Sequence, residues 1–189
     1  MHLIVGLGNP GRIYKYSRHN VGSRIIDALA KDKDIPLRID TNLKSVIGRG
    51  EIFGKDVLIA KPLVFMNLAG EVVKMIVSKK RILANNLLVV YDDIDLGFKA
   101  LRLKPKGGCA GHKGMTSIID NLGTRDFARL KIGIGRPTHK EEISDYVLSR
   151  FTKEEERALK PTLDDALNCC LTWIKDGVEK AMEKFNIPR

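Results

Sequence analysis

The chain has 189 residues and a mass of 21.1 kDa, which is enough for one domain with its own hydrophobic core. Its composition, 43% hydrophobic and 30% charged, excludes a disordered or rod-like protein, and no apolar run reaches the roughly 18 residues of a membrane span. Lysine and arginine number 33 against 23 aspartate and glutamate residues, and the resulting net charge of +10 suggests a polyanionic partner.

Strand-like and helix-like segments alternate along the chain. In chain order, the predicted elements are a strand at 2–7, a helix at 21–31, strands at 45–52 and 56–60, a helix at 70–80, a strand at 86–91 and strands at 98–103 and 129–135. The segments 2–7 and 86–91 are continuously apolar, as in strands buried on both faces, whereas the other four alternate in polarity and are expected to be more exposed or at an edge. Apolar residues at helical spacing predict that both helices cover the sheet.

The segment from Phe151 onward is predicted to be helical in pieces. Thr152 and Glu155 have the spacing of a capping box, and Pro161 is expected to interrupt or restart the helix. Trp173 falls in the apolar stripe that follows and is expected to be packed. Together the elements predict a single domain over residues 1–189, an α/β fold with three α/β/α layers around a mixed, mostly parallel central sheet.

The first glycine-rich loop, residues 6–11, matches the dinucleotide-binding pattern G-x-G-x-x-G. In dinucleotide-binding folds a helix begins inside this pattern, whereas here Pro10 and Gly11 indicate a turn and the helical spacing begins only at Val21. No acidic residue ends a second buried strand at the expected spacing either, so the sequence disfavours nucleotide binding. The loop and its continuation instead place polar and aromatic residues after a strand end, where α/β proteins hold their sites: Asn9, Tyr14, His19 and Asn20.

Two of the four histidines lie in positions that suit catalysis. His19 precedes a predicted helix, and His112 lies in the second glycine-rich loop, residues 107–114. Imidazole has an unperturbed pKa of about 6.5, which suits a general base at neutral pH, and it needs an acceptor that fixes one tautomer. Carboxylates follow the predicted strand at 86–91, but spacing alone does not choose between Asp92 and Asp93 as that acceptor.

Other kinds of site have weaker support in the sequence. The acidic residues at 92–95 lack the glycine spacing of a calcium loop, and the cysteines and histidines never form the short-spaced pairs of a zinc site. Cys109, three residues before His112, is a candidate nucleophile, although a small residue in a tight loop is the commoner explanation. We therefore expect neither a metal nor a cofactor.

The positive charge is concentrated in residues 96–140, which we call the basic segment. It contains ten basic and two acidic residues, whereas the segment from Phe151 onward is close to neutral. The odd number of cysteines, with Cys169 adjacent to Cys170, suits a reducing compartment better than a disulfide framework. With no signal peptide and no membrane span predicted, we expect a cytoplasmic protein that does not bind membranes.

Five motifs, taken in order, resemble the bacterial-type peptidyl-tRNA hydrolases over essentially the whole chain. They are residues 5–11 (VGLGNPG) followed by Tyr14 and 18–22 (RHNVG), 61–62 (KP) with 65–70 (FMNLAG), 92–96 (DDIDL), 111–114 (GHKG) and 129–135 (RLKIGIG). Each motif alone is weak evidence, but five at matching spacing form a specific pattern.

The resemblance implies a monomeric enzyme that cleaves the ester between a peptide and the terminal ribose of tRNA, without a metal or a cofactor. It implies that His19 is the catalytic base and that Asp92, rather than Asp93, orients it. It also implies that Asn9 distinguishes a blocked peptidyl amide from a free amine, and that Asn67 supports the catalytic centre. The residues that the resemblance assigns to the substrate and the tRNA end are Tyr14, Phe65, Asn67, His112 and Lys113.

At one position the chain departs from the family pattern. The family usually has Gly-His-Asn-Gly where this chain has Gly111-His112-Lys113-Gly114. Lysine cannot accept a hydrogen bond, but it can meet a phosphate as a point charge, so Lys113 is expected to contact tRNA without performing the amide's role. The basic segment is expected to follow the phosphates of the acceptor stem. The principal alternative is a non-catalytic RNA-binding protein on the same fold, similar to plant organellar splicing factors, and a nucleotide-dependent oxidoreductase is more distant.

Overall fold

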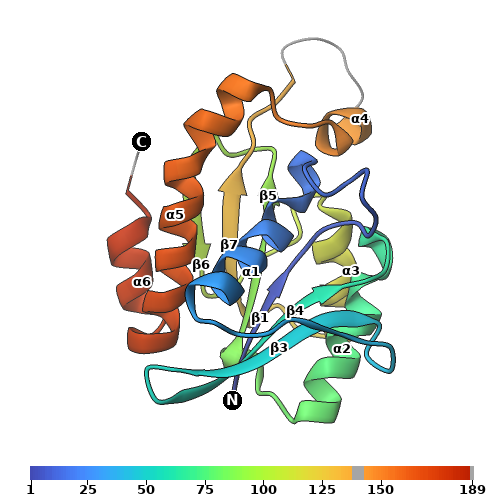
Figure 1. Ribbon diagram of the computed structural model, residues 1–189, viewed down its shortest axis with the longest axis vertical. Coiled ribbons are helices and arrows are strands. Elements are labelled where there is room, and N and C mark those ends of the chain that lie inside the picture. The colour runs from blue at the N-terminus through green and yellow to red at the C-terminus, as the bar shows by residue number, and fades with distance from the viewer. Residues whose placement is uncertain (138–142, 188–189) are drawn as a thin grey trace.

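The structure is a computed structural model that describes residues 1–137 and 143–187. Within these residues a seven-stranded sheet runs through the molecule, with helices on both of its faces (Figure 1). The strands are β1 (His2–Gly6), β2 (Arg38–Asp40), β3 (Ser45–Ile52), β4 (Lys55–Pro62), β5 (Leu87–Asp93), β6 (Leu101–Lys104) and β7 (Ala128–Gly133). The helices are α1 (Val21–Asp32), α2 (Ala69–Lys80), α3 (Lys113–Leu122), α4 (Ile143–Leu148), α5 (Lys153–Asp176) and α6 (Val178–Phe185). Short 3-10 helices are η1 (Arg18–Asn20), η2 (Met66–Leu68) and η3 (Ala84–Asn86).

The strand order is β2-β3-β4-β1-β5-β7-β6. The four central strands β4, β1, β5 and β7 are parallel, while β2, β3 and β6 pair antiparallel at the two sides. This arrangement confirms the predicted three-layer α/β/α fold with a mixed, mostly parallel sheet. No helix in the described ranges is long and apolar enough to cross a bilayer.

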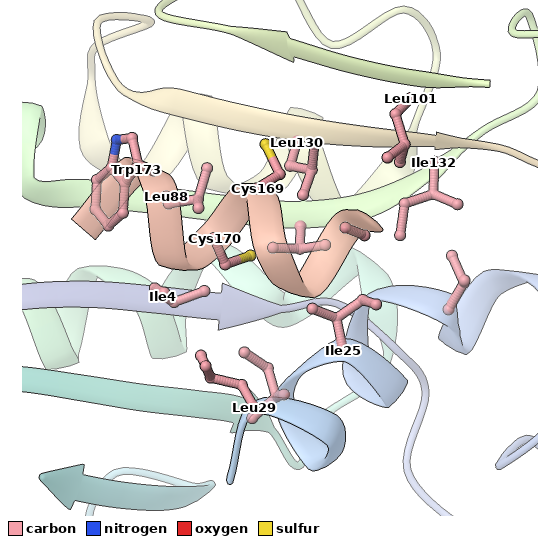
Figure 2. Close-up of a cluster of buried hydrophobic side chains, with 14 of the residues drawn as sticks. Ile4, Ile25, Leu29, Leu88, Leu101, Leu130, Ile132, Cys169, Cys170 and Trp173 are labelled. Carbon is pink, nitrogen blue, oxygen red and sulfur yellow. The ribbon is translucent and has the colours of Figure 1, made fainter. Parts of the chain in front are cut away.

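Two hydrophobic cores flank the sheet because successive strand residues point to opposite faces. Ile4 of β1 belongs to a core with α1, α5 and α6, whereas Leu3 belongs to the core with α2 and α3. Figure 2 shows the first core, where side chains of α1 and α5 meet over β1, β5 and β7. Trp173 is buried there, as predicted, with its ring edge-on to that of His2.

The predicted helices at 21–31 and 70–80 are confirmed to within one residue by α1 and α2, and the strand at 45–52 coincides with β3. The prediction that 56–60 and 129–135 are exposed or edge strands is wrong, because β4 and β7 each have neighbours on both sides and are largely buried. The strand predicted at 98–103 begins only at Leu101, since Lys99 adopts a positive φ of 70° within a turn. Its edge position, as β6, is confirmed.

The C-terminal helix differs from the prediction at Pro161. The capping box is confirmed, since the Thr152 hydroxyl accepts from the Glu155 backbone N–H and the Glu155 carboxylate accepts from that of Thr152. The expected interruption at Pro161 is wrong, because α5 continues through it to Asp176. Burial of Leu159 and Thr162 on either side stabilises this turn of the helix against the loss of one backbone hydrogen bond.

The site of interest lies at the carboxyl ends of the parallel strands. The connection after β1 leads to α1 on one face of the sheet, and the connection after β4 leads to α2 on the other, so the chain diverges at this edge. Such a divergence leaves a crevice where α/β proteins bind ligands. Gly22 of α1 packs directly on β5, where an added Cβ would lie 2.1 Å from the Val90 carbonyl oxygen.

Candidate active site

A cavity of about 860 Å³ opens at the carboxyl ends of β1, β4 and β5 and beside α3 and α4. The predicted site residues that line it are Asn9, His19, Phe65, Asn67, Asp92, His112 and Lys113. Tyr14 lies in the turn before η1, half-buried and outside this lining. The fold thus gathers into one cavity residues that are separated by up to about a hundred positions in the chain.

His19 and Asp92 form the centre of the site. His19 lies in η1, and its Nδ1 is 2.8 and 2.9 Å from the two carboxylate oxygens of Asp92. Asp92 and Asp93 are the last residues of β5 rather than residues that follow the strand, so they point in different directions. Asp93 pairs with Lys131 of β7 at 2.6 Å. The alternation of side chains along β5 therefore leaves Asp92, and not Asp93, facing His19.

His112 binds the same carboxylate, at the Oδ1 that also contacts His19. It is the N-cap of α3, and its Nδ1 accepts the backbone N–H of Met115 at 3.2 Å. Its proton must then be on Nε2, which donates to Asp92 Oδ1 at 3.1 Å. The two imidazole rings lie 4.8 Å apart between centroids.

The electrostatic state of Asp92 follows from these neighbours. Burial alone would raise its pKa, but the two facing imidazoles and their hydrogen bonds hold the pKa of Asp92 well below its usual range. An ionised Asp92 accepts from His19 Nδ1, so the neutral ring has an unprotonated Nε2. His19 Nε2 has no hydrogen-bond partner among the described residues, and the side chain lines the cavity. This geometry suits a general base.

Among the described residues, one group of side chains is spaced closely enough to hold a metal ion. It consists of His19, Asp92 and His112, whose ligand atoms all lie within 4.8 Å of one another. The sequence pattern missed this group because its members come from three separate segments. A zinc ion holds its ligands at about 2.0–2.2 Å, which separates tetrahedral ligands by about 3.3 Å or more. The Nδ1–Oδ1 distance of 2.8 Å between His19 and Asp92 is a hydrogen-bond distance instead. The cluster therefore fits a carboxylate shared by two imidazoles better than a zinc site.

Cys109 lines the cavity, but no free imidazole among the described residues is placed to activate it. A hydrogen bond with Thr116 lowers the pKa of its thiol. Both ring nitrogens of His112 are already used, one by Met115 and the other by Asp92. The arrangement therefore does not provide the cysteine–histidine pair that a thiol nucleophile needs.

Asn9 is held in place by two other segments of the chain. Its Oδ1 accepts the backbone N–H of Met66 at 2.9 Å, which ties the loop after β1 to the one after β4. Asn20 is the N-cap residue of α1, but its side chain makes no cap hydrogen bond. Its Oδ1 instead accepts from the Asn9 N–H at 2.8 Å and its Nδ2 donates to the Asn9 carbonyl at 2.9 Å. The Nδ2 of Asn9 has no hydrogen-bond partner within the described ranges and remains available to a substrate.

Replacing Asn20 with alanine is expected to lower the free energy of unfolding by about 1–3 kcal/mol, because the partly buried N–H and C=O of Asn9 lose their partners. Equilibrium unfolding in urea measures this change. Asn42→Ala is the matched control and should leave the free energy of unfolding unchanged, because the Asn42 side chain is exposed and makes no hydrogen bond with the described residues. Equal stability of Asn20→Ala and the unmodified chain would show that the two hydrogen bonds from Asn20 to the Asn9 backbone do not stabilise the fold.

Other predicted contacts lie at the rim of the cavity. Phe65 is 56% exposed, and Asn67 and Lys113 are also exposed. Asn67 makes no hydrogen bond with the described residues, so its predicted support of the catalytic centre would require a bound substrate.

The basic segment divides into structural and exposed charges. Arg129 is completely buried, so the prediction that this residue follows tRNA phosphates is wrong. Lys131 pairs with Asp93 and Arg136 with Asp95, and Lys140 lies outside the described residues. Arg136 is exposed although it is paired, and the other exposed basic residues among the described residues of the segment are Lys99, Arg102, Lys104, Lys106, Lys113 and Arg125.

Comparison with known proteins gives one consistent result over the whole chain. A family model described as peptidyl-tRNA hydrolase matches residues 3–189. A peptidyl-tRNA hydrolase of Sulfurihydrogenibium is 48% identical over 183 residues, which cover 97% of this chain and 96% of that protein. The chloroplastic peptidyl-tRNA hydrolase of Arabidopsis thaliana is 48% identical over 185 residues, which cover 97% of this chain and 64% of that protein.

The structural similarity extends over the same length. The crystal structure of peptidyl-tRNA hydrolase from Acinetobacter baumannii matches with a TM-score of 0.94 at 34% sequence identity and covers 100% of this chain and 96% of that one. Because the sequence and the fold both match from end to end, this chain belongs to the peptidyl-tRNA hydrolase family.

Proposed function

We propose that this protein hydrolyses the ester bond that joins a peptide to tRNA, and so releases the peptide and returns the tRNA to use. The observation that carries the proposal is the His19–Asp92 pair, whose unbonded Nε2 faces a cavity in a chain of this family. Hydrolysis of an ester at neutral pH needs an activated water and a donor for the developing oxyanion, and neither requirement calls for a cofactor.

The proposed reaction begins with a water molecule on His19 Nε2. Nε2 takes the proton as the water oxygen attacks the ester carbonyl carbon, and Asp92 stabilises the imidazolium that forms. The tetrahedral intermediate then collapses, the carbon–oxygen bond to the ribose breaks, and the imidazolium returns its proton to the ribose oxygen. His19 serves in this scheme as base and then as acid, while Asp92 stays ionised throughout.

The two asparagines are proposed to recognise the group next to the ester. The Nδ2 of Asn9 is free to donate while its Oδ1 is held by Met66, so Asn9 presents a donor of fixed orientation to a substrate carbonyl. Such a donor suits the amide carbonyl of a peptidyl group. An aminoacyl group with a free amine has no such carbonyl. Asn67, at the rim, would add a second amide beside the intermediate.

The tRNA is proposed to lie along the exposed lysines and arginines of the basic segment, which can neutralise acceptor-stem phosphates. Phe65, exposed at the cavity rim, offers a ring on which a base of the single-stranded 3′ end can stack, and Tyr14 is proposed as a second aromatic contact. We further propose a monomer in the cytoplasm, since one chain supplies every site residue and its cysteines are free thiols.

Lys113→Asn is expected to weaken tRNA binding and to lower the slope of log K against log salt concentration by about 1, because one phosphate contact is lost. The turnover number at saturating substrate should change far less than the affinity. Binding of deacylated tRNA over a salt series measures the slope. Lys160→Asn on α5 is the matched control, because that lysine is exposed and lies outside the basic segment. An unchanged slope for Lys113→Asn would remove Lys113 from the tRNA contacts.

The proposed function is tested by incubating the purified protein with peptidyl-tRNA in the presence of a chelator. Release of peptide and of deacylated tRNA at catalytic protein concentrations is expected. Salt-sensitive RNA binding without hydrolysis at any protein concentration would favour the alternative, a non-catalytic RNA-binding protein.

A further inference from the structure

Arg129 is the largest side chain that the fold buries completely, and it has no carboxylate partner among the described residues. A buried guanidinium is costly unless its donors are satisfied. Burial lowers the pKa of Arg129, yet arginine keeps its charge in proteins. A buried arginine at this position therefore calls for a role that an apolar residue could not perform, such as hydrogen bonding to the backbone around it.

The hydrogen bonds that the guanidinium makes with the described residues all go to main-chain carbonyls, while its buried Nε has no partner among them. Its Nη1 donates to the carbonyls of Gly107 and Gly108 at 2.6 and 2.9 Å, and its Nη2 donates to that of Arg125 at 2.9 Å. The Cζ atom lies over the Phe127 ring, 4.6 Å from the ring centroid. Arg129 thus fixes the first two residues of the second glycine-rich loop, which without it would have few constraints on their backbone.

That loop carries His112 to Asp92. The loop makes a turn in which the His112 N–H donates to the Cys109 carbonyl at 3.0 Å, and α3 begins immediately after it. Tyr91 lies between His112 and Arg129. Its ring is edge-on to that of His112, with 4.9 Å between the centroids, and its hydroxyl interacts electrostatically with the Arg129 guanidinium. Arg129 itself contacts neither His19 nor Asp92, so any effect on the reaction must pass through the loop and His112.

We propose that Arg129 is a positioning residue: by binding the carbonyls of Gly107 and Gly108, it holds His112 in the place and tautomer in which Nε2 donates to Asp92. The proposal rests on the proposed hydrolysis only for its kinetic consequence, because the position of His112 can be measured without substrate.

The direct test is the imidazole spectrum of protein labelled with ¹⁵N-histidine. The chain has only four histidines, and a His112→Ala spectrum assigns the residue. The unmodified chain should give His112 the nitrogen shifts of a ring protonated at Nε2. In Arg129→Lys, whose single amine cannot reach three carbonyls, these shifts should move toward the averaged values of a free histidine. Arg157→Lys, an exposed arginine of α5, is the matched control and should leave them unchanged.

Kinetics provide the second readout. Arg129→Lys should lower kcat for peptidyl-tRNA hydrolysis about tenfold with less than a twofold change in KM, because the site is displaced rather than its contacts with substrate removed. In the His112→Ala background the same substitution should change kcat by less than about twofold, since the residue through which Arg129 acts is gone. Equal losses in both backgrounds would overturn the proposal.

A second variant perturbs the loop without removing the buried charge. Gly107 has a φ of 158°, which L side chains rarely adopt, so Gly107→Ala strains the backbone where Arg129 binds it. Gly107→Ala should change the His112 nitrogen shifts in the same direction as Arg129→Lys. If Arg129→Lys does not fold, the shifts of Gly107→Ala test the positioning role instead. Unchanged His112 shifts in folded Arg129→Lys or Gly107→Ala would refute the positioning role. Absence of hydrolysis by the unmodified chain would instead refute the proposed function and leave the spectral test intact.

Discussion

Replacing His19 with alanine is expected to lower kcat for peptidyl-tRNA hydrolysis by about 10²–10⁴-fold, because the attacking water then loses its base and the ribose oxygen loses its acid. Rates of peptide release at saturating substrate measure the effect. The affinity for tRNA should change little, since His19 is almost buried and the exposed cations lie elsewhere. A His19→Ala variant that keeps its turnover would exclude His19 as the base.

His2→Ala is the matched control for this substitution. His2 lies at the opposite end of β1, with its ring edge-on to Trp173, and has no contact with the cavity. Its removal should leave kcat unchanged, so that a loss specific to His19 reports on the site rather than on the number of histidines.

The second large effect is expected for Asp92→Asn, with a loss of kcat of roughly 10³–10⁴-fold, a size known for the equivalent change in serine proteases. Asp92 Oδ1 accepts from both imidazoles, and both carboxylate oxygens face His19 Nδ1. An amide replaces one of these oxygens with an NH₂ group, which in either orientation faces His19 Nδ1 as a donor. His19 then loses the tautomer with a free Nε2. Asp93→Asn is the matched control, because its carboxylate pairs with Lys131 and not with His19. A greater loss of kcat in Asp93→Asn than in Asp92→Asn would reverse the assignment.

The same carboxylate makes the stability of the fold sensitive to acid. Because the pKa of Asp92 is lower in the folded state than in the unfolded chain, the unfolded chain takes up the proton first as the pH falls. The contribution of Asp92 is therefore fully present above a pH of about 4 and is lost below it. The free energy of unfolding should decline less steeply over this range in Asp92→Asn than in the unmodified chain.

The sequence predicts the regular parts of the fold well, for physical reasons that particular elements illustrate. The helices α1 and α2 have one apolar face that must meet the sheet, and hydrophobic spacing alone marks them. The sequence does not predict α3, because the glycines at its start favour a loop over the apolar spacing of Met115, Ile118 and Ile119. Pro161 shows the opposite case, since tertiary packing maintained a helix that local preference would end.

The sequence indicates which residues lie near the site better than it indicates the hydrogen bonds between them. Strand-end position and chemistry indicated His19 and the acidic residues, and the family resemblance indicated Asp92. Two features were beyond the sequence: the bond from His112 to the same carboxylate, and the bonds from Asn20 to the Asn9 backbone. Both join residues that are distant in the chain, and the distance between such residues depends on how helices and loops pack rather than on any local pattern.

The close packing of Gly22 on β5 determines which substitutions can alter the spacing of His19 and Asp92. His19 lies three residues before Gly22 in the chain, and the backbone against which Gly22 packs, at Val90, lies two residues before Asp92. The main-chain contact between Gly22 and Val90 therefore sets the spacing of His19 and Asp92, and side-chain replacements around the cavity do not alter that contact. Replacing Ile143, Val147 or Leu148, which line the cavity from α4, would therefore leave this main-chain contact and the spacing of His19 and Asp92 in place.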